Sequence, residues 1–226
     1  MAVAALAALA GSVRPVVVGA QRTVSEERYD DAFRKYTKRF FGPAFDWRYF
    51  KAQGMAESDL IPTAHSRVGA RGIMQLMPGT FKLMKSARPE FLSIDDPEWN
   101  IAAGIMHDKD LWEMWRDPSS SDERAAFMFG SYNAGEGPIM RARAAARAKQ
   151  LDQRVWTSVE RVAPDIERWR YQETLGYVKK IKSNKDNLST RDSRWFVKPD
   201  SSGSGGSSKP DSTVRSDKSR VKPHVR

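Results

Sequence analysis

The residue with the clearest chemical potential is Glu57, which is followed by a glycine-rich segment at 69–78. Two further groups of polar and aromatic residues follow, at 131–137 and 173–178. Cleavage of a glycosidic bond requires a carboxyl that is still partly protonated near neutral pH, and burial beside apolar groups favours that form. The order of these groups around one acid predicts a sugar-cleaving site.

A second carboxylate, the usual nucleophile or base of a glycosidase, is hard to find. Asp59 lies two positions from Glu57 and therefore on another helical face, while Asp95 and Asp96 read as a loop residue and a helix cap. The sequence therefore predicts an enzyme that works with one carboxylate.

The apolar periodicity is helical along most of the chain. Ser25 is a candidate N-cap for a helix in which Tyr29, Phe33, Tyr36 and Phe40 recur at three- and four-residue steps. A second helix over 46–58 places Glu57 on the same face as its aromatic residues. We therefore expect the acid to point inward.

Further helices are predicted from start signals and apolar stripes. They begin at Asp96-Pro97 and at Ser121, then at Pro138, and further helices cover 153–162 and 172–182. No convincing alternating strand is present, and residues 69–74 are the only expected site of a small hairpin or turn. The predicted fold class is mainly α.

Four motifs in order resemble those of the soluble lytic transglycosylase family, which shares the goose-type lysozyme fold. They are Glu57-Ser58, then Gly-Ala-Arg-Gly-Ile-Met-Gln-Leu-Met-Pro at 69–78, then Tyr132-Asn133-Ala134-Gly135, then Glu173-Thr174 with Tyr177. The resemblance covers roughly residues 45–183, and the fixed order makes chance agreement improbable. It implies a lysozyme-like helical domain with at most a small β-hairpin. It also implies cleavage of the β-1,4 bond between N-acetylmuramic acid and N-acetylglucosamine, with 1,6-anhydro ends.

The same resemblance assigns roles to single residues. Glu57 would be the sole acid/base, and Tyr132 would contact its carboxyl. Ser66 and Gln75 would hold the glycan, Met77 would form part of the cleft wall, and Tyr177 would stack on a sugar face. Asn133 would secure a helix end while belonging to the same binding region.

Each role has a structural alternative that the sequence leaves open. Ser66 can be a turn serine, Gln75 a loop-capping glutamine and Tyr177 a core tyrosine. Gly69, Gly72 and Gly135 are interpreted as backbone devices that permit close approach or positive φ.

The chain has a net charge of +10, no cysteine and three histidines. This charge favours a polyanion or an anionic surface as partner, so we expect peptidoglycan strands, with the wall or membrane surface as a further contact and no specific nucleic acid. His65, His107 and His224 have no metal-ligand spacing. The sequence predicts no metal, no cofactor and a monomer.

Four segments are predicted along the chain. Residues 1–22 form an apolar leader that resembles an export signal, although no Lys or Arg precedes it. Residues 23–45 form a helical arm, 46–183 the catalytic domain and 184–226 a disordered basic tail rich in Ser and Gly. The tail holds ten Lys or Arg against five Asp, so it is either an electrostatic tether or a solvated appendage. The expected location is the periplasm or cell envelope, with a phage particle as an alternative setting.

Two other functions compete with the transglycosylase. A goose-type hydrolase would need an aspartate that activates water, and none is evident near residues 72–76. A non-catalytic basic protein that binds wall or nucleic acid would keep the fold without activity. The basic run over 141–149 leaves this function open, although such a run is typical of a solvated helix face, and the intact Glu57 and Tyr132 oppose it.

Overall fold

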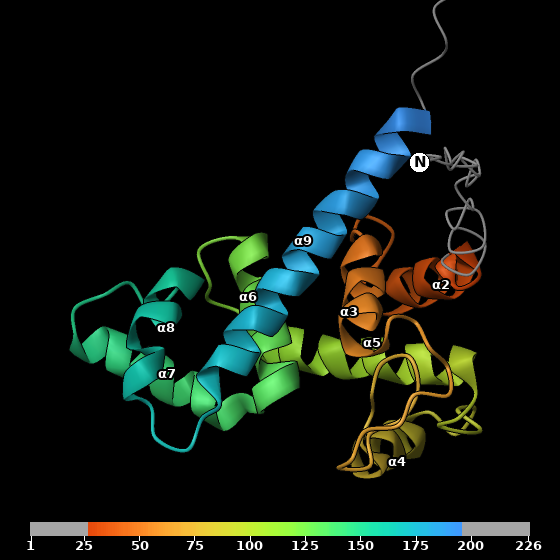
Figure 1. The fold of residues 1–226 in the computed structure, drawn as a ribbon, viewed down its shortest axis with the longest axis horizontal. Helices are drawn as coiled ribbons and strands as arrows, with labels where there is room; N and C mark the ends of the chain where they lie inside the picture. Colours follow the sequence, from red (N-terminus) through yellow and green to blue (C-terminus); the bar gives the residue numbers. More distant parts are fainter. Residues whose placement is uncertain (1–26, 196–226) are drawn as a thin grey trace, which may run out of the picture.

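The computed structural model describes residues 27–195, with side chains for 27–190. The predicted leader, Ser25, His224 and the tail beyond residue 195 lie outside the described residues. The described part is almost entirely helical, as predicted (Figure 1). Buried residues from its helices form one core cluster. The elements are α2 Asp30–Phe41, α3 Arg48–Ser58, α4 Pro78–Ala87, α5 Pro97–Met114, α6 Ser121–Ala134, α7 Glu136–Ala148, α8 Trp156–Val162, the short 3-10 helix η1 Ala163–Asp165 and α9 Tyr171–Trp195.

Helix α5 contacts α2, α4 and α6. Asp96 caps it, because its side chain accepts hydrogen bonds from the backbone of Glu98 and Trp99. Pro97 occupies the first turn, where its missing N–H costs nothing. The helix start that the sequence predicts at this point is confirmed.

Helix α2 belongs to the same packed body as the rest of the fold. Its face carries the fully buried Phe33 and Tyr36, and it packs against α5. Acidic residues in its first turn and basic residues in its last turn complement the helix dipole. The predicted helical arm is therefore part of the core of the fold.

Helix α4 is absent from the sequence-based prediction. Pro78 stands in its first turn, and Phe81 and Met84, three residues apart, are buried on one face. The exposed Leu83 lies between them and blurs the amphipathic pattern. Pro78 both ends the loop motif at 69–78 and starts this helix.

Helix α9 crosses the molecule beside α3 and α6 (Figure 1). The sequence predicts its end near residue 182, and this prediction is wrong: the helix continues to Trp195. Leu188 is buried, and Asn184 donates to the carbonyl of Ala52 at 3.3 Å. The first residues of the predicted disordered tail are therefore helical, because sparse apolar residues at helical spacing suffice when α3 lies alongside.

Residues 65–76 form the only strand-like structure among those described, two antiparallel bridges joining His65 to Arg71 and Arg71 to Leu76. This confirms the small hairpin predicted there, which is called the hairpin below. No helix within residues 27–195 combines the length and the hydropathy needed to cross a membrane.

Candidate active site

Glu57 lies in the last turn of α3, next to Ser58, after which Asp59 adopts a left-handed conformation with φ 56° and ends the helix. Its side chain is partly buried. Burial raises the pKa of Glu57 from 4.5 to about 7, although a hydrogen bond from Tyr177 and the charge of Lys180 both lower it. A carboxyl with a pKa near neutrality can both donate and accept a proton under physiological conditions.

Tyr177 of α9 supplies the phenol that orients the acid. Its hydroxyl donates to Glu57 Oε1 at 2.5 Å. Burial raises the pKa of Tyr177 well above its usual value, so the phenol keeps its proton and remains a donor. The sequence-based prediction gave this contact to Tyr132 and gave Tyr177 a stacking role; the structure reverses the first assignment and shows that the Tyr177 side chain is only 9% exposed.

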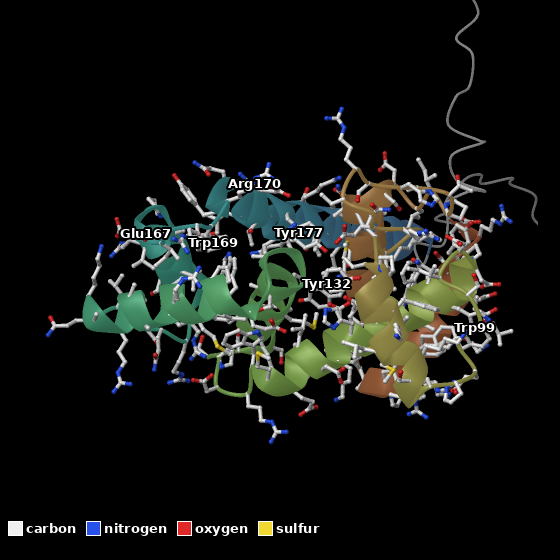
Figure 2. The ribbon with its side chains drawn as sticks, turned by 90° about the horizontal axis from the view of Figure 1, so that it is seen from below. Trp99, Tyr132, Glu167, Trp169, Arg170 and Tyr177 are labelled. Atoms are coloured by element: carbon white, nitrogen blue, oxygen red, sulfur yellow. The ribbon has the colours of Figure 1, made fainter. Side chains whose placement is uncertain are left out.

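Tyr132 of α6 holds the hairpin instead. Its hydroxyl donates to the carbonyl of Met74 at 2.8 Å, and its ring lies 5.2 Å from that of His107 on α5. Figure 2 shows Tyr132 and Tyr177 near the middle of the molecule, whereas Glu167, Trp169 and Arg170 lie toward the end that contains α7 and α8. Both tyrosines therefore serve the same site, one through the acid and one through the hairpin.

The hairpin is fixed from below by Asn100 of α5, a residue that sequence reasoning missed. Its side chain is fully buried; it accepts from Met74 N at 2.8 Å and donates to the carbonyls of Arg71 and Ile94 at 2.9 and 3.0 Å. Gly72 has φ +74°, and a Cβ there would lie 2.4 Å from the Asn100 amide. Only glycine therefore fits the turn that brings the hairpin onto α5.

Ser58, the residue after the acid, makes a hydrogen bond to the hairpin. Its hydroxyl donates to the carbonyl of Ile73 at 2.9 Å and so ties the end of α3 to the hairpin. Gly69 and Gly135 have positive φ, as predicted for both. The last turn of α3, which carries Glu57, is thus hydrogen-bonded to the hairpin through Ser58.

Ser66 and Gln75 form hydrogen bonds within the loop itself. The Ser66 hydroxyl accepts from Ala70 N at 2.9 Å, and the Gln75 amide donates to the carbonyls of Gly72 and Ala64 at 2.9 and 3.2 Å. Gln75 has φ 46°, a left-handed conformation that a non-glycine residue adopts only when its surroundings hold it there. Met77 is 43% exposed at the start of α4, whereas Met74 is fully buried.

Asn133 lies in a relay that joins α6 to α9. Thr174 donates to Asn133 Oδ1 at 2.9 Å and receives a hydrogen bond from Trp169 Nε1 at 3.0 Å. Thr174 is 2% exposed. The third and fourth motifs thus meet at this hydrogen bond, and Trp169, which the sequence gave no reason to select, completes it.

None of the three aspartates considered from the sequence lies in a position to act as a second catalytic carboxylate. Asp59 is exposed beyond the end of α3, Asp95 pairs with Arg71 at 3.3 Å, and Asp96 caps α5. A carboxyl that the sequence did not single out, Asp108 of α5, is fully buried, and burial together with the charge of Glu57 raises its pKa well above the usual value.

Two surface cavities lie away from this cluster. One, of about 690 Å³, borders α7 and includes Trp115, Met140 and Arg143. The other, of about 610 Å³, lies between α6, α8 and α9. Glu57 lines neither, so the candidate site is identified by its chemistry and not by the volume of a cavity.

The family model of the transglycosylase SLT domain matches residues 34–155, more than half of the chain. The chain belongs to the transglycosylase SLT domain family. Its matched region contains Glu57, the hairpin and the Tyr132 motif, whereas Tyr177 lies beyond it.

Similar proteins include the membrane-bound lytic murein transglycosylase F of Vibrio cholerae, 31% identical over 155 residues, which are 67% of this chain and 27% of that protein. The corresponding protein of Shewanella frigidimarina is 30% identical over 148 residues, 64% of this chain and 29% of the relative. The chain thus spans less than a third of the length of these relatives.

The fold is also that of a solved structure, the 70-kDa soluble lytic transglycosylase of Escherichia coli. The two share 28% sequence identity with a TM-score of 0.55 over 71% of this chain and 24% of the other. A complex of the 70-kDa soluble lytic transglycosylase with bulgecin A matches at 26% identity with a TM-score of 0.56, over 73% and 24%. The lysozyme-like helical fold predicted for this SLT domain is therefore confirmed.

Proposed function

We propose that this SLT domain is a peptidoglycan lytic transglycosylase that cleaves the β-1,4 bond between N-acetylmuramic acid and N-acetylglucosamine and leaves 1,6-anhydro ends. The observation that carries the proposal is Glu57: a carboxyl with a pKa of about 7, hydrogen-bonded by Tyr177 and tied through Ser58 to the hairpin. Membership of the family and the names of its relatives support the same reaction class.

In the proposed reaction Glu57 first gives its proton to the leaving oxygen as the C1–O bond breaks. The carboxylate that remains then takes the proton of the muramic 6-hydroxyl while that oxygen closes on C1, which restores the acid. Tyr177 and Lys180 favour the carboxylate between the two steps, and burial favours the acid before and after them. A pKa near 7 suits a group that must do both. The substrate's N-acetyl group would stabilise the positive charge at C1.

The glycan would bind along the hairpin side of Glu57. Met77, exposed at the start of α4, would contact a sugar face. Ser66 would offer its hydroxyl proton and Gln75 its amide oxygen, because the loop hydrogen bonds use the Ser66 oxygen and the Gln75 N–H groups. Tyr132, Asn133 and Tyr177 would act from behind, by holding the hairpin, joining α6 to α9 and orienting the acid.

An envelope setting would follow from the substrate. The relatives are named membrane-bound murein transglycosylases, and we propose that this chain acts on the wall as a monomer in the periplasm or after export. The net charge of +10 would favour contact with the anionic wall or membrane surface.

Mass spectrometry of peptidoglycan digested by the purified protein tests the proposal. We expect 1,6-anhydromuropeptides from the wild type and almost none from Glu57→Gln. Products with reducing ends alone would establish a hydrolase instead. No release by wild-type protein that is folded and binds sacculi would favour the non-catalytic binding protein.

A further inference from the structure

Asp108 is a carboxyl in an unusual position. It lies on α5 with 0% exposure, and its one hydrogen bond among the described residues comes from the Gln53 amide, with Nε2 3.3 Å from Oδ1. Among the described residues its second oxygen, Oδ2, has no partner, and neither has Oε1 of Gln53, which is equally buried. A buried carboxylate with one bare oxygen is unfavourable, so this arrangement requires an explanation.

The two bare atoms are complementary if Asp108 carries a proton. A carboxylic acid and a primary amide form a cyclic pair in which N–H donates to one oxygen and O–H donates to the amide oxygen. The first bond of that pair is present, and the two atoms without partners are the donor oxygen and the acceptor of the second. One proton on Asp108 would therefore give both bare atoms a partner.

The polar and titratable groups around Asp108 are consistent with a protonated carboxyl. They are Gln53 and Glu57 on α3, Tyr132 on α6 and Tyr177 on α9. On α5 itself Lys109 pairs with Glu113 at 2.6 Å. No described cation on α2, α4 or any other element acts on Asp108; burial raises its pKa well above the usual value, and Glu57 raises it further.

Gln53 links this pair to the catalytic residue. It lies four residues before Glu57 on α3, so both side chains occupy one helical face. We propose that Asp108 is a positioning residue of this active site, which as a neutral acid pairs with the Gln53 amide and so fixes the face of α3 that carries Glu57. A proton on Asp108 also keeps a second negative charge away from Glu57 when that residue becomes a carboxylate.

The part that concerns Glu57 rests on the proposed function, but the protonation of Asp108 can be tested without turnover. If Asp108 is neutral in the folded protein and ionised when unfolded, folding takes up a proton above the unfolded pKa of about 3.9. The wild type should then lose stability relative to Asp108→Asn as pH rises. The ratio of their unfolding constants should grow by up to about tenfold per pH unit.

Asp110→Asn is the matched control, since it makes the same change on the same helix at an exposed position. Partial burial raises the pKa of Asp110 as well, although the charge of His107 opposes this effect, so the ratio for Asp110→Asn should change less with pH than that for Asp108→Asn. A ratio for Asp108→Asn that stays flat from pH 5 to 8 would overturn the proposal. So would a wild-type ¹³C NMR titration, assigned through backbone correlations, in which the Asp108 carboxyl is already ionised at pH 6.

Activity then tests the positioning role. Asn can form the same amide pair, so Asp108→Asn should keep kcat/KM within a few-fold and leave its pH profile unmoved. Asp108→Leu should lower kcat/KM by about tenfold or more, because small misplacements of a catalytic group are costly. A shift of the alkaline limb to lower pH in Asp108→Asn would show that the wild-type residue is charged. Equal activity of the Asn and Leu variants would remove the positioning role.

If wild-type protein yields no anhydro products, the proposed function fails while the stability and NMR results still decide the state of Asp108.

Discussion

Replacing Tyr177 by Phe should raise the pKa of Glu57 and move the alkaline limb of the activity profile to higher pH. The phenol donates to Glu57 at 2.5 Å and lowers the pKa of that carboxyl. Activity falls as Glu57 loses the proton it must donate. Without the phenol the acid keeps that proton to a higher pH, because the hydrogen bond favours the charged form.

The magnitude follows from the strength of the bond. A hydrogen bond to a charged group contributes about 1.5 to 3 kcal/mol, and one pKa unit corresponds to about 1.36 kcal/mol. The limb should therefore move from near pH 7 upward by about 1 to 2 units. Below pH 6 Glu57 is protonated in both proteins. Proton donation to the leaving oxygen should therefore be less affected than the second step, in which the carboxylate acts as base.

Tyr132→Phe is the matched control, because it removes the same hydroxyl from a residue whose partner is the Met74 carbonyl. It should cost about 1 kcal/mol or more of stability and some activity, and it should leave the limb in place. The assay is kcat/KM on soluble glycan strands from pH 5 to 9, with the melting temperature of each variant measured in parallel. An unmoved limb in Tyr177→Phe, or a larger shift in Tyr132→Phe, would refute the assignment of the phenol to Tyr177.

Two further predictions concern the acid and the end of the chain. Glu57→Gln should lower turnover by about a hundredfold or more, and near-normal turnover would remove Glu57 from the mechanism. The folded-state pKa of Glu57 is raised from 4.5 to about 7, so the wild type loses stability as pH rises through that window. In denaturant titrations the Gln variant should therefore gain about 2 to 3 kcal/mol of stability relative to the wild type between pH 4 and 8. A chain ending after Trp195 should melt like the full chain but bind sacculi more weakly at low salt, since it loses seven Lys or Arg and three Asp and charge attraction is screened near 1 M salt. A chain ending after Ser183 should be less stable by about 2 to 4 kcal/mol, because it also loses the buried Leu188 and the hydrogen bond from Asn184; equal melting of the two truncated forms would show that the last turns of α9 contribute nothing.

The sequence by itself predicted most of the helices and singled out Glu57 as the candidate acid. Helical periodicity, the Asp96-Pro97 start and the glycines of the hairpin are local signals, and each depends on residues within a few positions of one another. Glu57 could be selected because it shares a helical face with buried residues and precedes motifs in a fixed order. The end of α9 could not be predicted, because its last turns are stabilised by α3, which lies more than a hundred residues away in the chain.

Only the tertiary structure decided which groups meet. Tyr132 and Tyr177 both follow plausible motifs, and nothing in their local sequence tells which phenol reaches Glu57; the crossing of α9 over α3 settles it. Asn100 and Asp108 carry no local signal at all, because a buried polar residue on an apolar helix is recognised by its partners. Those partners come from the hairpin and from α3, and contacts between distant segments are set by packing and not by periodicity.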